Sequence, residues 1–196
     1  MQESHRLTQI IQQQLETPSV EYKRSAEWSE LRPKLIRTCL AMANIRDGGT
    51  IIIGVSQNGP EFSLSGMSGA EISTYKSDDI RAAINAYADP PIEIEWRTVE
   101  IEGRTFGALV VQEFQQFPVL CRKDGLGLEE GAFYFRSSRM PETAKVKSHF
   151  EMRDILDRAI DRGVAAFVQR VRNAGLSFGD DGESDAAKFA KQREEN

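Results

Sequence analysis

The chain has 196 residues, which is enough for one well-filled domain and a tail. Its hydrophobic content of 40% excludes a disordered chain, and its net charge of −5 argues against a uniformly basic nucleic-acid binder. No apolar run approaches the roughly 18 residues of a membrane helix. The first residues lack the basic-then-apolar layout of a signal peptide, so we expect a cytoplasmic protein.

The negative charge is unevenly distributed along the chain. Residues 51–115 carry 4 basic and 10 acidic side chains, whereas residues 1–50 carry 7 and 6 and residues 116–150 carry 6 and 4. A local basic surface is therefore compatible with the overall charge. The two cysteines, Cys39 and Cys121, are too few for a disulfide framework or a cysteine zinc site, and we expect both to be buried thiols.

The first quarter of the chain predicts two helices and two strands. Apolar residues at helical spacing predict a helix over residues 7–15, and alternation predicts a short strand over residues 19–24. Helical spacing returns over residues 29–46 and stops at Gly48-Gly49. Residues 50–55 are apolar without alternation, which indicates a strand covered on both faces.

The middle of the chain predicts a helix and a hairpin. A short strand is expected over residues 62–64 and a helix over residues 77–88, which carries acidic side chains in its first turn. Residues 92–101 and 104–112 alternate on either side of Glu102-Gly103, a strong signal for a two-residue hairpin turn.

The last part of the sequence predicts a second strand pair, a long helix and a tail. Residues 118–122 and 132–136 flank a glycine-rich loop, and an apolar stripe from residue 148 continues for about six helical turns. Charged residues follow Gly175. The elements together predict an α/β (α+β) fold with a mixed sheet and flanking helices. Three segments are expected: a domain over 1–147, an amphipathic helix over 148–175 that packs on the domain or on a partner, and a charged tail over 176–196.

Glu16 and Glu21 stand on either side of a proline and could bring two carboxylates together. Such a pair can bind a divalent cation, and the cation can activate water against a phosphodiester. Solvated glutamates are the commoner outcome of this spacing. Lys23 and Arg24 could either pair with Glu21 or reach a phosphate.

Two further segments carry candidate binding residues. Asn44 can fix the helix-to-strand turn that ends in two glycines, although this turn lacks the arrangement of a nucleotide P-loop. Arg136, Ser137 and Arg139, followed by Lys145, combine cationic and hydroxyl groups that contact sugar–phosphate backbones. A solvated loop explains the latter group about equally well.

The order of these segments resembles the Schlafen AlbA-type domain, a family associated with nucleic-acid binding. The matching pieces are Glu16-x4-Glu21-Tyr22-Lys23, the stretch from Ala43-Asn44 to Gly54-Val55, and Tyr134-Phe135-Arg136-Ser137-Ser138 with Ala144. The resemblance implies an α/β fold with a mixed sheet and flanking helices.

Some Schlafen proteins are metal-dependent endoribonucleases with three carboxylates, and the resemblance gives Glu16 and Glu21 the first two catalytic and metal-binding positions. The third position falls at Ser56 and Gln57, which are not anionic, and Glu61 follows a few residues later. The resemblance therefore favours a non-catalytic nucleic-acid-binding module that needs no cofactor.

The alternatives are a Schlafen-type endoribonuclease using Mg²⁺ or Mn²⁺ and a protein-assembly subunit that forms a homodimer or a larger assembly. A role in transcriptional regulation or phage defence is conceivable from the family. In the leading hypothesis the partner is DNA or RNA, and no membrane is involved.

Overall fold

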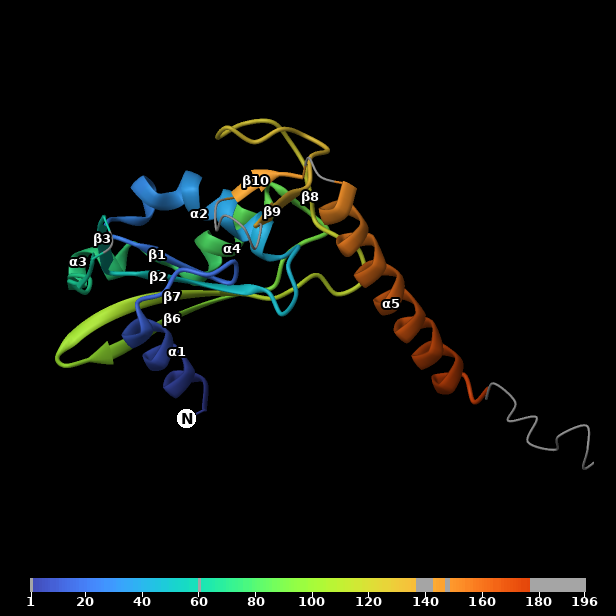
Figure 1. Cartoon of the computed structure of the whole chain (residues 1–196), viewed down its shortest axis with the longest axis horizontal. Helices are drawn as coiled ribbons and strands as arrows, with labels where there is room; N and C mark the ends of the chain where they lie inside the picture. Colours follow the sequence, from blue (N-terminus) through green and yellow to red (C-terminus); the bar gives the residue numbers. More distant parts are fainter. Residues whose placement is uncertain (1, 60, 137–142, 147–148, 177–196) are drawn as a thin grey trace, which may run out of the picture. The chain divides into compact units, whose positions relative to one another are not determined.

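The protein is described by a computed structural model over residues 2–59, 61–136, 143–146 and 149–176 (Figure 1). The helices are α1 (Gln2–Gln13), α2 (Trp28–Met42), α3 (Gly69–Ser73), α4 (Ser77–Asn85) and α5 (His149–Asn173). The longer strands are β1 (Val20–Lys23), β2 (Gly49–Ile53), β3 (Val55–Asn58), β4 (Glu61–Leu64), β6 (Ile94–Ile101) and β7 (Arg104–Val111). The short strands are β5 (Ala88–Asp89), β8 (Leu120–Cys121), β9 (Tyr134–Arg136) and β10 (Thr143–Lys145).

The central sheet has four strands in the order β1-β2-β7-β6. Strands β1 and β2 are parallel and are joined by α2, whereas β7 is antiparallel to both of its neighbours. The hairpin between β6 and β7 turns at Glu102 and Gly103, both of which have positive φ, as a primed two-residue turn requires. The mixed sheet with flanking helices confirms the expected fold class.

Both faces of the sheet are covered, which explains the unbroken apolar run of β2. Ile51 and Ile53 pack in one cluster with α2 and α4, whereas Ile52 packs in a second cluster with Leu7 and Ile11 of α1. Figure 1 shows α1 on one side of the sheet and α2 on the other. The prediction of a strand buried on both faces is confirmed, because all five residues of β2 are buried.

Glycines shape the turns at both ends of β2. Gly48 has φ +68°, and a Cβ there would collide with the carbonyl oxygen of Val111. Gly54 has φ +105°, and a Cβ there would lie 2.9 Å from the backbone of Gly66. The glycines of this motif are thus required by backbone conformation and by close backbone approach.

One expected strand pair is only partly formed. Residues 118–122 and 132–136 touch through a single bridge, Leu120 to Phe133, while β8 pairs with β5 and β9 pairs with β10. The loop between them closes on itself through a bridge from Gly125 to Leu128. Each of these short strands thus has its main partner outside the expected pair.

By its internal contacts the chain divides into two units, residues 1–159 and residues 160–196, and α5 contributes to both. The long C-terminal helix is confirmed, at 25 residues or about seven turns. Its predicted apolar stripe is mostly exposed: Ile155 is buried, but Leu156, Ile160 and Val164 are between 48% and 62% exposed. The three-segment division of the chain remains a prediction.

Both cysteines are buried free thiols, as expected. Burial raises the pKa of each thiol, so both are neutral at physiological pH. Within the described ranges, no helix is long and apolar enough to cross a membrane.

Candidate functional site

The motif segments that are distant in sequence meet at strand β1. Arg136 of β9 is 1% exposed, and its guanidinium lies 2.5 Å from the Glu21 carboxylate. The same guanidinium donates to the carbonyl oxygens of Pro18, at 2.8 Å, and Thr17, at 3.4 Å. Lys23 forms an ion pair with the second oxygen of Glu21. Glu21 is therefore held between two cations, which offsets the cost of burying it.

Glu16 lies next to this group and is partly exposed. One of its carboxylate oxygens accepts a long hydrogen bond, 3.4 Å, from the backbone N–H of Tyr22. Between the two glutamates, Thr17 and Val20 exchange backbone hydrogen bonds of 3.1 and 3.2 Å in a tight turn. The turn fixes the path of the chain from Glu16 to Glu21.

The third position of the expected carboxylate centre lies in β3. Ser56 is partly buried, Gln57 is exposed with its amide bonded to the Gly59 carbonyl, and Glu61 begins β4 opposite Asn58. Within the described ranges, no group of three histidine, cysteine or acidic side chains is placed to hold a metal ion. The catalytic and metal-binding roles of Glu16 and Glu21 therefore remain predictions.

Asn44 is fully buried at the turn after α2. Its amide nitrogen donates to the carbonyls of Val119, at 2.8 Å, and Tyr134, at 3.1 Å, and more weakly to that of Leu40, at 3.3 Å. Its amide oxygen accepts from the Val119 N–H at 2.8 Å. Every hydrogen-bonding group of this side chain is thus used inside the protein. The structure gives Asn44 the role of joining α2 to β9, and no polar atom of its side chain is left for a ligand.

The other predicted binding cations lie at the surface. Arg24, with 58% of its side chain exposed, pairs with Glu30, and Lys145, at 38%, lies 2.5 Å from Glu129. The hydrogen bond to Glu129 raises the pKa of Lys145, so this side chain is charged at physiological pH. Ser137 and Arg139 lie outside the described residues. Of the predicted residues, the structure brings Glu16, Glu21, Lys23 and Arg136 together and leaves Arg24 and Lys145 apart from them.

Two exposed cations of α2 were missed by sequence reasoning. Arg37 donates to the Thr143 carbonyl of β10 at 3.1 Å, and its guanidinium lies 5.9 Å from the centre of the Tyr134 ring. Lys34 is exposed one turn earlier on the helix. The spacing of Glu30, Lys34 and Arg37 already placed them on one polar face of the predicted helix.

A second buried arginine–glutamate pair also escaped sequence reasoning. Arg158 of α5 is 5% exposed and lies 2.7 Å from Glu113, and it donates to the Asn44 carbonyl at 2.6 Å. The other oxygen of Glu113 accepts from the Asp47 N–H at 3.0 Å. This pair ties the beginning of α5 to the same turn that Asn44 holds from within.

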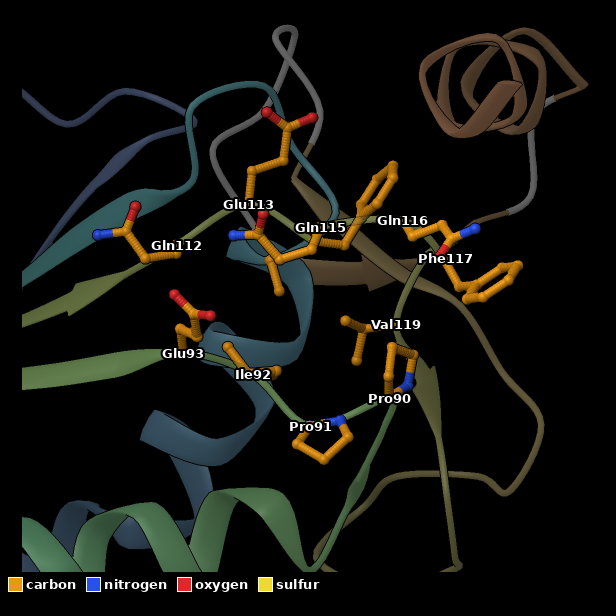
Figure 2. A pocket seen from close by; sticks show the side chains of 12 residues that line it. Pro90, Pro91, Ile92, Glu93, Gln112, Glu113, Gln115, Gln116, Phe117 and Val119 are labelled. Carbon is orange, nitrogen blue, oxygen red and sulfur yellow. The ribbon is translucent and has the colours of Figure 1, made fainter. Parts of the chain in front are cut away.

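A mostly apolar cavity of about 150 Å³ lies beside this turn (Figure 2). Its walls come from two segments, residues 90–93 and 112–117, with Ala43 and Val119 completing the lining. None of the residues predicted to bind or to catalyse lines it. The predicted site is therefore a surface around β1, α2 and β10 and does not include this cavity.

Comparison with known proteins gives one family and likenesses to several solved structures. No curated protein matches the chain. The DIP2311 protein from Corynebacterium diphtheriae is 18% identical with a TM-score of 0.44, over 65% of this chain but only 22% of that one. The N-terminal domain of a RecG-related protein from Nitrosomonas europaea has the same identity and score over 63% of this chain and 86% of that one. The family model Schlafen, AlbA_2 matches residues 16–145, two thirds of the chain, so this protein belongs to the Schlafen AlbA_2 family.

Proposed function

We propose that this protein is a nucleic-acid-binding module that holds the sugar–phosphate backbone through surface lysine and arginine side chains. Its family membership supports a role connected with nucleic acid. The observation that carries the proposal is a continuous line of cations on α2 and its neighbours. We call the surface formed by Arg24, Lys34, Arg37 and Lys145 the basic face.

Hydrogen bonds, an ion pair and helical spacing link the members of the basic face. Arg37 bonds to the Thr143 carbonyl and lies 5.9 Å from the centre of the Tyr134 ring, and Lys145 stands directly opposite Tyr134 in the β9–β10 pair, on the same face. Lys34 is one turn from Arg37 and one turn from Glu30, which pairs with Arg24. The four cations therefore lie along one surface of α2 and β10.

The charge of the basic face differs from that of the whole chain. Its four cations have two acidic partners, Glu30 and Glu129, which leaves a local charge of +2 in a protein of −5. Within the described ranges, neither Lys34 nor Arg37 has a carboxylate partner. Exposed cations of this kind neutralise phosphates and release counterions, which provides affinity without reading the sequence.

Buried residues of the family motif support the basic face and do not take part in binding. Asn44 holds the strand that carries Tyr134, whose ring the Arg37 guanidinium contacts, and Arg136 joins the same strand to Glu21 of β1. The motif thus determines where α2 and β10 meet. In this proposal, direct phosphate contacts come from the exposed cations, with Lys23 at the edge of the surface and 22% exposed.

The test is a fluorescence anisotropy titration of the full chain with single-stranded RNA, transfer RNA and duplex DNA, between about 50 and 200 mM salt. The variant Lys34→Gln/Arg37→Gln removes two central cations. We expect its affinity to fall at least about tenfold and its salt slope to decrease by about 2. The matched control Lys76→Gln/Arg104→Gln removes the same charge elsewhere and should bind like the original chain.

Each contrary outcome is informative. Absence of binding to all three probes at low salt would contradict the function, whereas equal weakening by the two double variants would reject the basic face alone. Binding to RNA and DNA with similar affinity is expected for backbone contacts, and a strong preference for one base sequence would point to a different surface.

A metal-dependent endoribonuclease is the alternative function. The side chains present do not fit a metal centre well, because both oxygens of Glu21 are engaged by Lys23 and Arg136 and Ser56 and Gln57 lack charge. Cleavage of labelled transfer RNA with Mn²⁺ or Mg²⁺ that disappears in Glu16→Ala and in Glu21→Ala would favour this alternative. Roles in transcriptional regulation and phage defence stay predictions that follow from the family alone.

A further inference from the structure

We propose that α5 pairs with α5 of a second copy of this chain, in antiparallel orientation, through the surface formed by Ile160, Val164, Phe167 and Val171. We call this surface the α5 stripe. Its residues follow one another at intervals of four, three and four, which is the repeat that lets two helices pack along a shared seam. Ile160, Val164 and Phe167 are 62%, 57% and 55% exposed, respectively.

The α5 stripe is symmetric about its own midpoint. In an antiparallel pair centred between residues 165 and 166, Ile160 packs against Val171 of the second copy and Val164 packs against Phe167 of the second copy. The two outer layers each pair Ile160 with Val171, and the two central layers each pair Val164 with Phe167. Every layer is therefore filled by two apolar side chains. The same contacts form twice, as a two-fold interface requires.

Charge selects the antiparallel orientation and a second copy as the occupant. Asp161 and Arg172 lie eleven residues apart, or about three turns, and therefore flank the stripe on the same side at its opposite ends. In the antiparallel pair, each Asp161 and Arg172 of the second copy differ by about 3 Å in position along the helix axis. The long arginine side chain can span this difference. In a parallel pair the two copies of each charged residue lie at the same level but on opposite sides of the seam, so neither Asp161 nor Arg172 meets an opposite charge there.

The interface is short, so the pair should be weak. Four residues a side bury less surface than a standard stable complex, which predicts a dissociation constant of about micromolar or weaker. A further consequence rests on the proposed function, whereas the pairing itself does not. Two linked basic faces would bind a long nucleic acid more tightly than a short one, because the second contact is intramolecular.

The test is sedimentation equilibrium of the full chain without nucleic acid, over a concentration series reaching several hundred micromolar, with circular dichroism to check folding. We expect a reversible monomer–dimer equilibrium. The variant Val164→Glu should be monomeric throughout, because it places a charge in each central layer. The matched control Gln169→Glu adds the same charge on the opposite side of the helix and should leave the equilibrium unchanged.

Charge reversal tests the orientation separately. Asp161→Arg alone and Arg172→Asp alone should each weaken pairing at least about threefold, and the double variant should restore it, because the opposite charges are exchanged. A chain that stays monomeric at every concentration would overturn the proposal. A dimer that is indifferent to Val164→Glu, or a double reversal that does not recover, would overturn the assigned surface or its orientation. Because no nucleic acid is present, these outcomes are independent of the proposed function.

Discussion

The Glu21–Arg136 pair and the Glu113–Arg158 pair are both glutamate–arginine ion pairs, but their surroundings differ. In the first, Glu21 also pairs with Lys23, which is partly exposed, and the group borders the predicted binding surface. In the second, both side chains are 6–7% exposed, and the guanidinium and carboxylate are each completed by a backbone group of the turn after α2. In the first pair the glutamate has a second cationic partner, Lys23, whereas in the second pair the arginine has a second carboxylate partner, Asp154, at 3.2 Å.

The two pairs also differ in their relation to the family. Both partners of the first pair lie within the matched residues 16–145, whereas Arg158 lies beyond them in α5. The family segment alone would therefore leave the Glu113 carboxylate buried without its arginine. The comparison teaches that the beginning of α5 is an internal part of the folded domain, although the family match ends before it.

The largest expected effect comes from Arg158→Met. This variant removes the Arg158 cation from the buried Glu113 carboxylate and the donor from the Asn44 carbonyl, so the free energy of unfolding should fall by about 3–5 kcal/mol. Urea denaturation measures the change, and Arg153→Met, on the exposed surface of the same helix, is the matched control. A loss below about 1 kcal/mol would show that α5 is not integral to the domain.

A double replacement distinguishes the free-energy cost of losing the ion pair from the cost of leaving one buried charge unpaired. Glu113→Gln combined with Arg158→Met removes both charges, so the double variant should be more stable than Arg158→Met alone by at least about 1 kcal/mol. The same denaturation experiment measures it. Additive losses would mean that the two side chains act independently.

A smaller effect is expected from Arg136→Met. The hydrogen bonds to the Thr17 and Pro18 carbonyls are lost, but Lys23 still neutralises Glu21, and the free energy of unfolding should fall by about 2–3 kcal/mol. Arg122→Met, in an exposed loop, serves as the control for urea denaturation. If Arg136→Met cost as much as Arg158→Met, Lys23 would not compensate for the loss of Arg136 beside Glu21.

The smallest effect is expected from Lys23→Met. Glu21 keeps its short contact with Arg136, so unfolding free energy should change by no more than about 1 kcal/mol, and less at high salt. The measurement is thermal or urea denaturation at low and high ionic strength. A loss of several kcal/mol would show that Lys23, and not Arg136, is the principal partner of Glu21.

Local patterns in the sequence predicted the elements that local physics controls. The unbroken run of β2 indicated burial on both faces, and Glu102-Gly103 indicated the hairpin, because strand alternation and turn conformation depend on adjacent residues. The family, too, was recognisable from three short motifs in order. The pairing of β8 and β9 was not predictable in this way, since each strand found a partner outside the expected hairpin.

The sequence by itself determined the family, the fold class and most of the strands and helices. Tertiary structure alone decided which polar residues are buried and which remain available to a ligand. Asn44 finds its partners 75 and 90 residues away, and Arg136 finds the Pro18 carbonyl 118 residues away. A buried polar group is stable only when it has hydrogen-bond partners, and here these partners come from distant parts of the chain. Local spacing in the sequence does not indicate which distant residues will be in contact.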